Sequence, residues 1–270
     1  METYHRPRKR FGQNFLHDQS VISAIIAAAQ LNSTDHILEI GPGQGALTQR
    51  ILPQVATLDI IEIDRDLAQS FVESNHDKLT VHVGDALRLD WREILRDDNY
   101  KLIANLPYNI STQILFKMME HRQHFTRMVL MFQKEVGDRL RAQPGTKEYG
   151  ALTVMCQLWF DVDRVLLVSP QSFRPPPKIM SEVLKFDRLE QPRVRVDDQE
   201  FFQRVVKAAF AQRRKTLRNC LHAAGFSKSS VDITQEAGTI DMRRRGETLS
   251  IQEFAQLATQ LQTIENNLLS

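Results

Sequence analysis

A four-residue stretch of this chain combines an amide side chain, backbone carbonyls and an aromatic ring. It reads Asn105-Leu106-Pro107-Tyr108 and directly follows the short apolar run 101–104. Proline has no backbone N–H and restricts the preceding leucine to an extended conformation, so nearby carbonyl groups can point at a ligand. The tetrapeptide can therefore form a pocket for an amine on a flat ring. A strand-to-helix turn that contains a buried tyrosine is the alternative interpretation.

A glycine-rich turn follows another apolar run, at 36–40. It reads Gly41-Pro42-Gly43-Gln44-Gly45 and leads into a predicted helix that starts at 46–48. Glycines permit tight turning and let a ligand approach the backbone at the N-terminus of a helix. The spacing is not the G-x-G-x-x-G of dinucleotide-binding proteins, and no lysine completes a P-loop. Glu39, just before the turn, can face an amino group of a ligand or brace the loop.

Carboxylates stand at the ends of the next two predicted strands. Glu62 lies where an acid can accept both hydroxyls of a ribose, unless it caps the helix that follows. Asp64 can serve as that cap, which leaves Glu62 for the ribose. In Gly84-Asp85-Ala86 the aspartate can accept the exocyclic amine of an adenine, although a turn residue is the alternative.

These strand ends together predict the cofactor and the chemistry. Gly41, Glu62, Asp85 and Asn105 suit a nucleoside without a pyrophosphate, which favours S-adenosylmethionine over NAD. If the Asn105 side-chain oxygen and the Leu106 carbonyl accept both hydrogens of an adenine N6 amine, its lone pair becomes localised for in-line methyl transfer. Tyr108 would stack on the base. We find no Ser/His/Asp or Cys/His arrangement that would support nucleophilic catalysis.

The elements that must position these residues alternate along the first part of the chain. Apolar runs at 36–40, 57–63, 79–83, 101–104 and 127–132 alternate with helical stretches, which predicts a parallel, doubly wound α/β sheet. Further strands are expected at 162–168 and 179–186, on either side of Pro175-Pro176-Pro177, and a helix at 149–159. Asp18 is expected to cap a helix that ends near Gln30.

From about residue 188 amphipathic helical patterns replace the strands. We therefore predict two domains. Residues 1–190 form a Rossmann-like α/β catalytic domain with a basic N-terminal tail, and residues 191–270 form a smaller all-helical domain. Pro192 and the polar stretch that follows it mark the boundary.

Basic residues are concentrated in two acid-free segments, although the net charge is only +2. The first contains Arg6, Arg8, Lys9 and Arg10, and the second, at 203–218, contains Arg204, Lys207, Arg213, Arg214, Lys215 and Arg218. Such segments fit either a phosphate backbone as partner or a solvated helix face. Arg214 and Arg218 are four residues apart and are predicted to share a helix face.

Cysteine usage and hydropathy exclude several classes of protein. The two cysteines, Cys156 and Cys220, show neither C-x-x-C nor Cys/His ligand spacing, so we expect no disulfide framework and no metal site. No apolar run is long enough to span a membrane, and Phe11-Gly12-Gln13-Asn14 interrupts any signal-like core. A cytoplasmic protein is expected.

Five segments of the chain form a specific set in this order. They are Phe11-Gly12-Gln13-Asn14-Phe15-Leu16, Glu39-Ile40-Gly41-Pro42-Gly43, Asn105-Leu106-Pro107-Tyr108-Asn109-Ile110-Ser111, Phe173-Arg174-Pro175-Pro176-Pro177-Lys178 and Gln212-Arg213-Arg214-Lys215-Thr216-Leu217-Arg218-Asn219. Together they closely resemble the KsgA (RsmA) rRNA adenine N6-dimethyltransferase family. The resemblance runs from residue 11 to the end, and its one small departure is Ile179-Met180-Ser181, where the family more often has a valine followed by a varied residue.

The resemblance implies a class I methyltransferase fold and assigns site residues. With the glycine turn and the third strand end included, the expected cofactor contacts are Asn14, Leu16, Glu39, Gly41, Gly43, Glu62, Asp85, Ala86 and Asn105. Phe173 is expected on the face of the base opposite Tyr108, or else packed under the proline loop. RNA contacts are expected at Arg213, Arg214, Lys215 and Arg218.

The resemblance also implies the reaction. S-adenosyl-L-methionine would donate methyl groups to N6 of two adjacent adenosines in the loop of the 3′-terminal hairpin of 16S rRNA, leaving S-adenosyl-L-homocysteine. The partner would be the pre-30S subunit, with a role in 30S biogenesis, and the protein would act as a monomer without a metal.

Other functions remain open at this point. They include an antibiotic-resistance adenine N6-methyltransferase of 23S rRNA, and an RNA-binding small-subunit assembly factor for which methylation is secondary. A DNA adenine methyltransferase would usually carry a second proline at position 106. The glycine spacing and the lack of a Tyr-x-x-x-Lys pair disfavour an oxidoreductase.

Overall fold

The computed structural model describes residues 7–8, 11–96 and 99–269, so Arg6, Lys9 and Arg10 of the predicted basic tail lie outside the described residues. The chain divides into two compact units. The first comprises Met1–Gly137 and Asp161–Arg188, and the second comprises Asp138–Phe160 and Leu189–Ser270.

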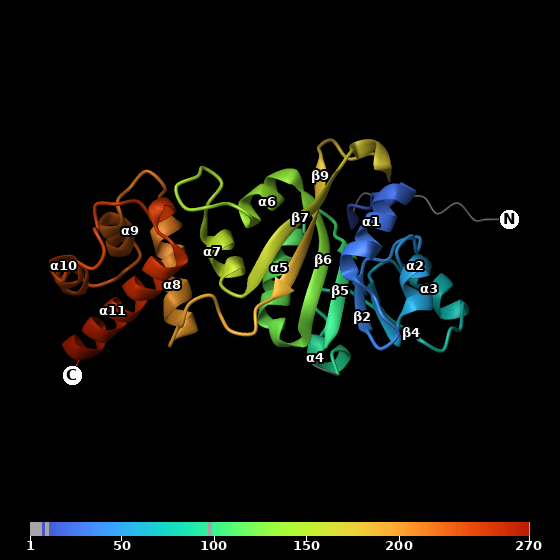
Figure 1. The fold of residues 1–270 in the computed structure, drawn as a ribbon, viewed down its shortest axis with the longest axis horizontal. Helices are drawn as coiled ribbons and strands as arrows, with labels where there is room; N and C mark the ends of the chain where they lie inside the picture. Colours follow the sequence, from blue (N-terminus) through green and yellow to red (C-terminus); the bar gives the residue numbers. More distant parts are fainter. Residues whose placement is uncertain (1–6, 9–10, 97–98, 270) are drawn as a thin grey trace. The chain divides into compact units, whose positions relative to one another are not determined.

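A seven-stranded sheet forms the centre of the first unit (Figure 1). Its order is β4 (Leu79–Val83), β3 (Thr57–Glu62), β2 (His36–Ile40), β5 (Tyr100–Asn105), β6 (Phe125–Gln133), β9 (Ser181–Arg188) and β7 (Phe160–Val168). The strands from β4 to β6 run parallel, and β9 is antiparallel to β6. The predicted doubly wound α/β sheet is confirmed, and each predicted strand is present within a few residues of its expected bounds.

The strand order reverses between β2 and β5. From β2 the chain proceeds outward to β3 and β4 on one side, and from β5 to β6 on the other. Ile40 and Ala104 lie opposite each other in the parallel register, so the two loops that leave these strands start side by side. In an open α/β sheet a ligand binds in the crevice at such a reversal point.

Successive side chains of a strand point to opposite faces of the sheet, and here both sets are buried. Helices must therefore cover both faces. The helices of the first unit are α1 (Gln19–Ala29), α2 (Thr48–Ile51), α3 (Arg65–Glu73), α4 (Trp91–Ile94) and α5 (Ser111–Glu120), with 3₁₀ turns η2 (Leu52–Gln54), η3 (Arg122–His124) and η4 (Pro170–Ser172). Helix α6 (Lys134–Leu140) spans the division between the units.

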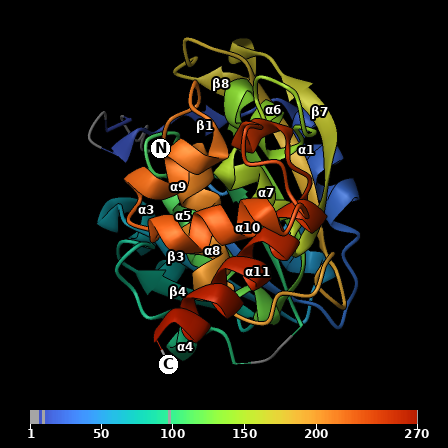
Figure 2. The same cartoon turned by 90° about the vertical axis from the view of Figure 1, so that its left-hand side faces the viewer.

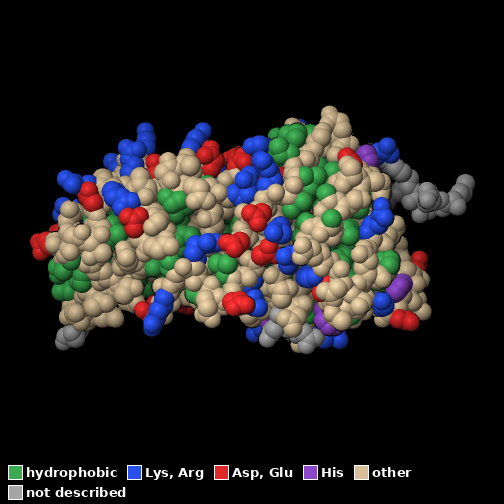
Figure 3. All heavy atoms as spheres, in the orientation of Figure 1, with side chains coloured by type: hydrophobic (Ala, Val, Ile, Leu, Met, Phe, Trp, Pro, Cys, Tyr) green, Lys and Arg blue, Asp and Glu red, His purple; other side chains and the backbone are tan. Residues whose placement is uncertain are grey.

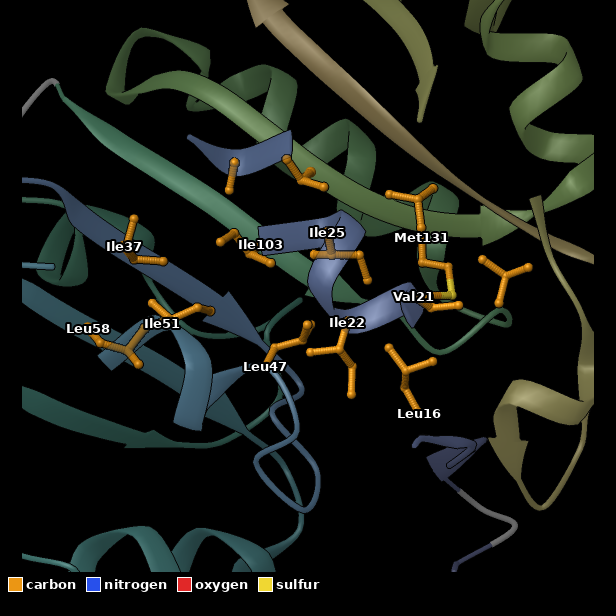
Figure 4. Close-up of a cluster of buried hydrophobic side chains, with 14 of the residues drawn as sticks. Leu16, Val21, Ile22, Ile25, Ile37, Leu47, Ile51, Leu58, Ile103 and Met131 are labelled. Carbon is orange, nitrogen blue, oxygen red and sulfur yellow. The ribbon is translucent and has the colours of Figure 1, made fainter. Parts of the chain in front are cut away.

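Helix α1 shows how the sequence specifies one of these layers. As predicted, Asp18 caps it by accepting hydrogen bonds from the backbone of residues 20 and 21, and it ends at Gln30 in a left-handed conformation. Its apolar side chains, including Ile22 and Ile25, pack with strand residues such as Ile37 in one buried cluster (Figure 4). Alternate strand residues such as Leu38 are buried as well, so the opposite face of the sheet is also covered.

A short antiparallel pair joins the N-terminal segment to the proline loop. Strand β1 (Phe15–Leu16) pairs with β8 (Phe173–Arg174), and the triple proline follows β8 without belonging to a strand or helix, as predicted. This pairing places residues 15–16 beside a segment more than a hundred residues away in sequence, which no local pattern could show.

The second unit is helical (Figures 1 and 2). It contains α7 (Ala151–Gln157), α8 (Gln199–Phe210), α9 (Leu217–Ala223), α10 (Lys228–Glu236), the 3₁₀ turn η5 (Gly246–Thr248) and α11 (Ile251–Leu269). Helix α8 packs against α9 and α11, and α10 packs against α11.

The predicted domain boundary differs from this division in one respect. The end of the first unit at Arg188 agrees closely with the expected division at 190, but residues 138–160, expected in the first domain, belong to the helical unit. The reason is packing, since the ring of Tyr149 lies edge-on to that of Phe210, with 5.9 Å between their centroids. Within the described part of the chain, no helix is long and apolar enough to cross a membrane.

Candidate functional site

A pocket lies where β2, β3, β4 and β5 end. It contains about 950 Å³ of empty space, part of it open to solvent, a size that suits a small-molecule ligand. Every position predicted for the cofactor or for catalysis lines it: Asn14, Leu16, Glu39, Gly41, Gly43, Glu62, Asp85, Ala86, Asn105, Leu106, Pro107 and Tyr108. Residues expected at separate strand ends therefore share one site.

The glycine turn presents its backbone to this pocket. Gly41 and Gly43 have φ angles of +68° and +59°, a conformation that favours glycine. A Cβ atom added to Gly41 would meet nothing within 4 Å, so this side of the turn is open for a ligand. A Cβ on Gly43 would lie only 3.0 Å from the Phe15 ring, which forms the neighbouring wall.

Glu39, just before the turn, is hydrogen-bonded to the helix that follows the turn. Its carboxyl group is buried and accepts a hydrogen bond of 2.7 Å from the hydroxyl of Thr48, at the start of α2. Burial raises the pKa of Glu39 to about 8, and the nearby Glu62 adds to the rise. The carboxyl group is therefore largely protonated at neutral pH, and a cation at this end of the pocket would favour its ionised form.

Glu62 connects the glycine turn to α3. One carboxylate oxygen accepts from the backbone N–H of Asp64 at 2.8 Å, and the other accepts from that of Gly43 at 3.2 Å. Asp64 caps α3 through the N–H of Asp66, which confirms the expected cap. Each carboxylate oxygen can accept more than one hydrogen bond, so Glu62 can also receive hydroxyl groups of a ligand. Burial raises its pKa.

Asp85 is a turn residue, which was the alternative interpretation of its role. Its Oδ1 atom accepts from the N–H of Leu87 at 2.9 Å, and its other oxygen lies 3.6 Å from Nε of Arg88. The adjacent Ala86 carbonyl accepts from the indole of the buried Trp91 at 3.0 Å. Both residues line the pocket, so Asp85 has a structural role and a ligand-facing position together.

The amide of Asn105 has a fixed orientation. Its Nδ2 atom donates to the backbone carbonyl of Asn14 at 3.2 Å, and a carbonyl can only accept. The Oδ1 atom therefore faces the other way and has no hydrogen-bond partner among the described residues. At the edge of a pocket, this oxygen is an acceptor available for an amine.

Tyr108 is half-buried and is held at both ends. Its hydroxyl group forms a hydrogen bond with the hydroxyl of Ser181 on β9, and its backbone carbonyl accepts from Ser111 at 3.1 Å. Burial raises its pKa. The ring lines the pocket, so the turn with a buried tyrosine and the amine pocket are both features of the same segment.

Phe173 lies elsewhere than expected. Its side chain is only 1% exposed and packs in the core cluster with Leu16, its partner across the β1–β8 pair. Phe173 is not among the residues that line the pocket with Tyr108, and its burial favours the alternative interpretation, in which it is a packing residue. Burial of an apolar ring beside β1 stabilises this arrangement.

The basic residues of the second segment all belong to the helical unit. Arg214 and Arg218 do not share a helix, because α8 ends at Phe210, Arg214 lies in the following turn and Arg218 lies in α9. Arg218 pairs with Asp232 at 2.8 Å, and Arg213 pairs with Glu247 at 3.1 Å. Figure 3 shows Lys and Arg side chains along an edge of this unit near α9.

Sequence reasoning missed the attachment of the N-terminal segment. Arg8 belongs to the basic segment that fitted either a phosphate partner or a solvated face, and it pairs with Asp64 at 2.7 Å and with Asp66. Gln13 also donates to Asp64, at 3.0 Å. The family-like segment 11–16 was the sequence signal that this region matters. It does not indicate which residues near α3 it contacts. Further lining residues that were not predicted include Phe11, Gln13, Phe15, Pro42, Gln44, Ile63 and Ile110.

With this geometry established, comparison with known proteins identifies the family. Residues 4–263 match the family model described as ribosomal RNA adenine dimethylase. The chain belongs to this family.

Two named relatives are similar in sequence to nearly the whole chain. A protein named ribosomal RNA small subunit methyltransferase A from Syntrophotalea carbinolica is 60% identical over 258 residues, which cover 96% of this chain and 98% of that protein. One of the same name from Geobacter sulfurreducens is 51% identical over 93% of this chain and 94% of its own.

Two solved structures are similar in fold to this chain. A dimethyladenosine transferase from Plasmodium falciparum is 28% identical with a TM-score of 0.78, over 94% of this chain and 98% of that one. The 23S rRNA methyltransferase ErmE, at 23% identity and a TM-score of 0.69 over 92% of this chain and 100% of that one, shares the fold. The predicted membership of the dimethyltransferase family and the class I methyltransferase fold are confirmed.

Proposed function

We propose that this enzyme uses S-adenosyl-L-methionine to dimethylate N6 of two adjacent adenosines in the loop of the 3′-terminal hairpin of 16S rRNA. The observation that carries the proposal is the unpaired Oδ1 atom of Asn105 at one end of a nucleoside-sized pocket. The family and its small-subunit relatives support the choice of reaction and of RNA.

The lining of the pocket fits this cofactor. The open backbone at Gly41 gives room for close approach, and Glu62 can accept ribose hydroxyls. Ala86 and the half-exposed Ile63 supply an apolar wall for the adenine ring. We propose Asn14, Leu16, Glu39, Gly41, Gly43, Glu62, Asp85, Ala86 and Asn105 as the residues that hold it. When bound, the cofactor supplies a methyl group activated by its sulfonium.

The residues of the tetrapeptide prepare the acceptor amine. Asn105 Oδ1 and the Leu106 carbonyl accept the two N6 hydrogens, which localises the nitrogen lone pair for attack. Pro107 keeps this backbone out of a helix. The face of Tyr108 stacks on the base, which contributes roughly 1–3 kcal/mol. No strong base is needed, because the methylated nitrogen is acidic and its proton can leave to solvent.

The substrate RNA must present an unstacked base. An adenosine inside a paired helix cannot reach the end of the sheet, whereas a loop adenosine can. A second methylation on the same nitrogen starts with one N–H left, so the first methyl group must rotate away from Asn105. Arg213, Arg214, Lys215 and Arg218 of the helical unit would contact RNA phosphates of the pre-30S particle.

We place the protein in the cytoplasm as a monomer, where ribosomal subunits assemble. Both cysteines are free thiols and are buried, which suits a reducing compartment. Among the described residues, no group of three or more His, Cys, Asp or Glu could hold a metal ion, and the proposed chemistry uses none.

The test is to incubate small-subunit particles that lack the modification with methyl-labelled cofactor and to locate the label in the RNA. We expect two methyl groups on each of two adjacent adenosines near the 3′ end of 16S rRNA. Label in 23S rRNA would instead establish the resistance-type activity. Tight binding to the particles without any label would support an assembly factor and contradict the proposal.

A further inference from the structure

The hydroxyl group of Tyr108 is engaged by a residue that lies far from the tetrapeptide in sequence. Ser181 is the first residue of β9 and its side chain is fully buried. Its hydroxyl and that of Tyr108 are hydrogen-bonded, and neither has another side-chain partner among the described residues. Each of the two hydroxyl groups is therefore the hydrogen-bond partner of the other.

The position of Ser181 is fixed by the sheet. Ser181 pairs with Gln133 at the end of β6, and the N–H of Lys134 donates to the carbonyl of the preceding Met180 at 3.0 Å. A side chain at this register has little freedom, so its hydroxyl is a rigid point of attachment. The backbone of Tyr108 is held separately by Ser111, at the start of α5.

These two attachments act on opposite ends of one side chain. With the backbone held by Ser111 and the hydroxyl held by Ser181, both ends of the long axis of the Tyr108 side chain are held in place. A stacking platform needs such fixation, because the reacting nitrogen must meet Asn105 and the methyl group within a few tenths of an ångström.

We propose that Ser181 is a positioning residue that holds the Tyr108 ring in its place for the target adenine. This inference rests on the proposed function and extends it from the tetrapeptide to β9. It also assigns a role to the tyrosine hydroxyl, which the stacking chemistry alone leaves unused.

The first test is a double-mutant cycle on methyl transfer to small-subunit particles. We expect Ser181→Ala and Tyr108→Phe each to lower kcat about tenfold, and the double variant to be no worse than either, because both remove one hydrogen bond. Ser181→Thr keeps the hydroxyl and should restore most of the rate. If the loss of kcat in the double variant is the product of the two single losses, or if Ser181→Ala has a normal rate, the proposal is overturned.

Two controls separate positioning from general damage. Ser230→Ala removes another fully buried serine hydroxyl, bonded to Ser227 in the helical unit, and should leave kcat within about twofold. Cofactor affinity, measured by calorimetry, should stay unchanged in Ser181→Ala, because Ser181 does not line the pocket.

A second test is independent of the reaction. The chain has four tyrosines, so 3-fluorotyrosine gives few fluorine resonances, and Tyr108→Phe identifies the one from Tyr108. We expect Ser181→Ala to shift and broaden this resonance and Ser181→Thr to restore it. An unchanged resonance overturns the inference even if the protein is active. If the unaltered protein methylates no RNA, the proposed function fails, while the fluorine spectra still decide whether Ser181 holds the ring.

Discussion

Asn105 shows how a contact with a distant segment can orient a single side chain. The carbonyl of Asn14, from the N-terminal segment, accepts from its Nδ2 atom, which leaves Oδ1 without a partner among the described residues. An isolated asparagine has no such preference, because its amide can rotate. Orientation of an acceptor before the substrate arrives is what makes it effective in catalysis.

We predict that Asn105→Ala lowers the rate of methyl transfer by about 100- to 1,000-fold, since loss of one preorganised polar contact typically has such an effect. RNA binding should change less than about threefold, because phosphate contacts dominate that affinity. Single-turnover transfer and filter binding measure the two quantities. The exposed Asn99→Ala is the matched control, and near-normal turnover of Asn105→Ala would contradict the proposed polarisation.

The ring of Tyr108 allows a related comparison. Tyr108→Ala should reduce transfer at least tenfold more than Tyr108→Phe, because it removes the stacking platform as well as the bond to Ser181. Initial rates at saturating cofactor measure the difference. Equal losses in the two variants would show that the ring face contributes nothing.

Glu39 makes the stability of the protein depend on pH. Burial raises its pKa from the ordinary 4.5 to about 8, so between these values the folded state holds a proton that the unfolded state releases. The stabilising contribution is complete below pH 4.5 and is lost as pH rises toward 8.

We therefore predict that Glu39→Gln, which keeps an acceptor for Thr48, flattens this dependence. Its free energy of unfolding relative to the wild type should rise by about 3–4 kcal/mol from pH 5 to pH 8, at roughly 1.4 kcal/mol per pH unit. Urea unfolding at several pH values measures this difference. The exposed Glu190→Gln should show no such trend, and parallel curves for Glu39→Gln would disprove the proton uptake.

At the scale of elements, the N-terminus of α3 is a junction. Asp64 caps this helix and also accepts from Gln13 and Arg8, which ties the segment at 11–16 to the pocket. One buried carboxylate thus stabilises a helix and holds a wall of the site in place. The glycine turn joins the same junction through Glu62.

We predict that Asp64→Ala lowers the free energy of unfolding by about 1–2 kcal/mol through loss of the cap, and more if the tether contributes. Cofactor affinity should fall about tenfold, because residues 11–16 line the pocket. Hydrogen exchange should increase at residues 11–16. Asp90→Ala removes the cap of α4 and serves as the control, since it should leave exchange at 11–16 unchanged.

At the scale of the whole molecule, the chain contains an α/β unit that holds the pocket and a helical unit that holds the basic segment. Several arginines of that segment already have carboxylate partners, which reduces their availability to RNA. Arg214 is exposed and makes no ion pair with any residue that the structure describes. It is therefore a phosphate contact to test.

We predict that Arg214→Ala lowers the slope of log affinity against log salt concentration for ribosomal particles by about one. Titrations at several salt concentrations give this slope. Arg195, exposed but paired with Asp197 at 2.7 Å, supplies the control variant, which should keep the slope. Identical slopes for both variants would show that Arg214 is a solvated surface residue that does not contact phosphate.

Much of the fold follows from local sequence signals. The strands, the Asp18 cap and the glycine turn depend on short-range patterns of apolar, polar and glycine residues, and all were predicted correctly. The assignment of 138–160 to the helical unit was not, because the packing of Tyr149 on Phe210 joins segments that are distant in sequence.

The sequence by itself determined the family, the sheet and the residues at the strand ends, because each depends on residue type and spacing along the chain. Tertiary structure alone decided that Phe173 lies in the core, that Arg8 pairs with Asp64, and that Ser181 holds Tyr108. These contacts join segments that are far apart in sequence. Side-chain partners across such distances depend on how the strands and loops pack, and no local pattern encodes that packing.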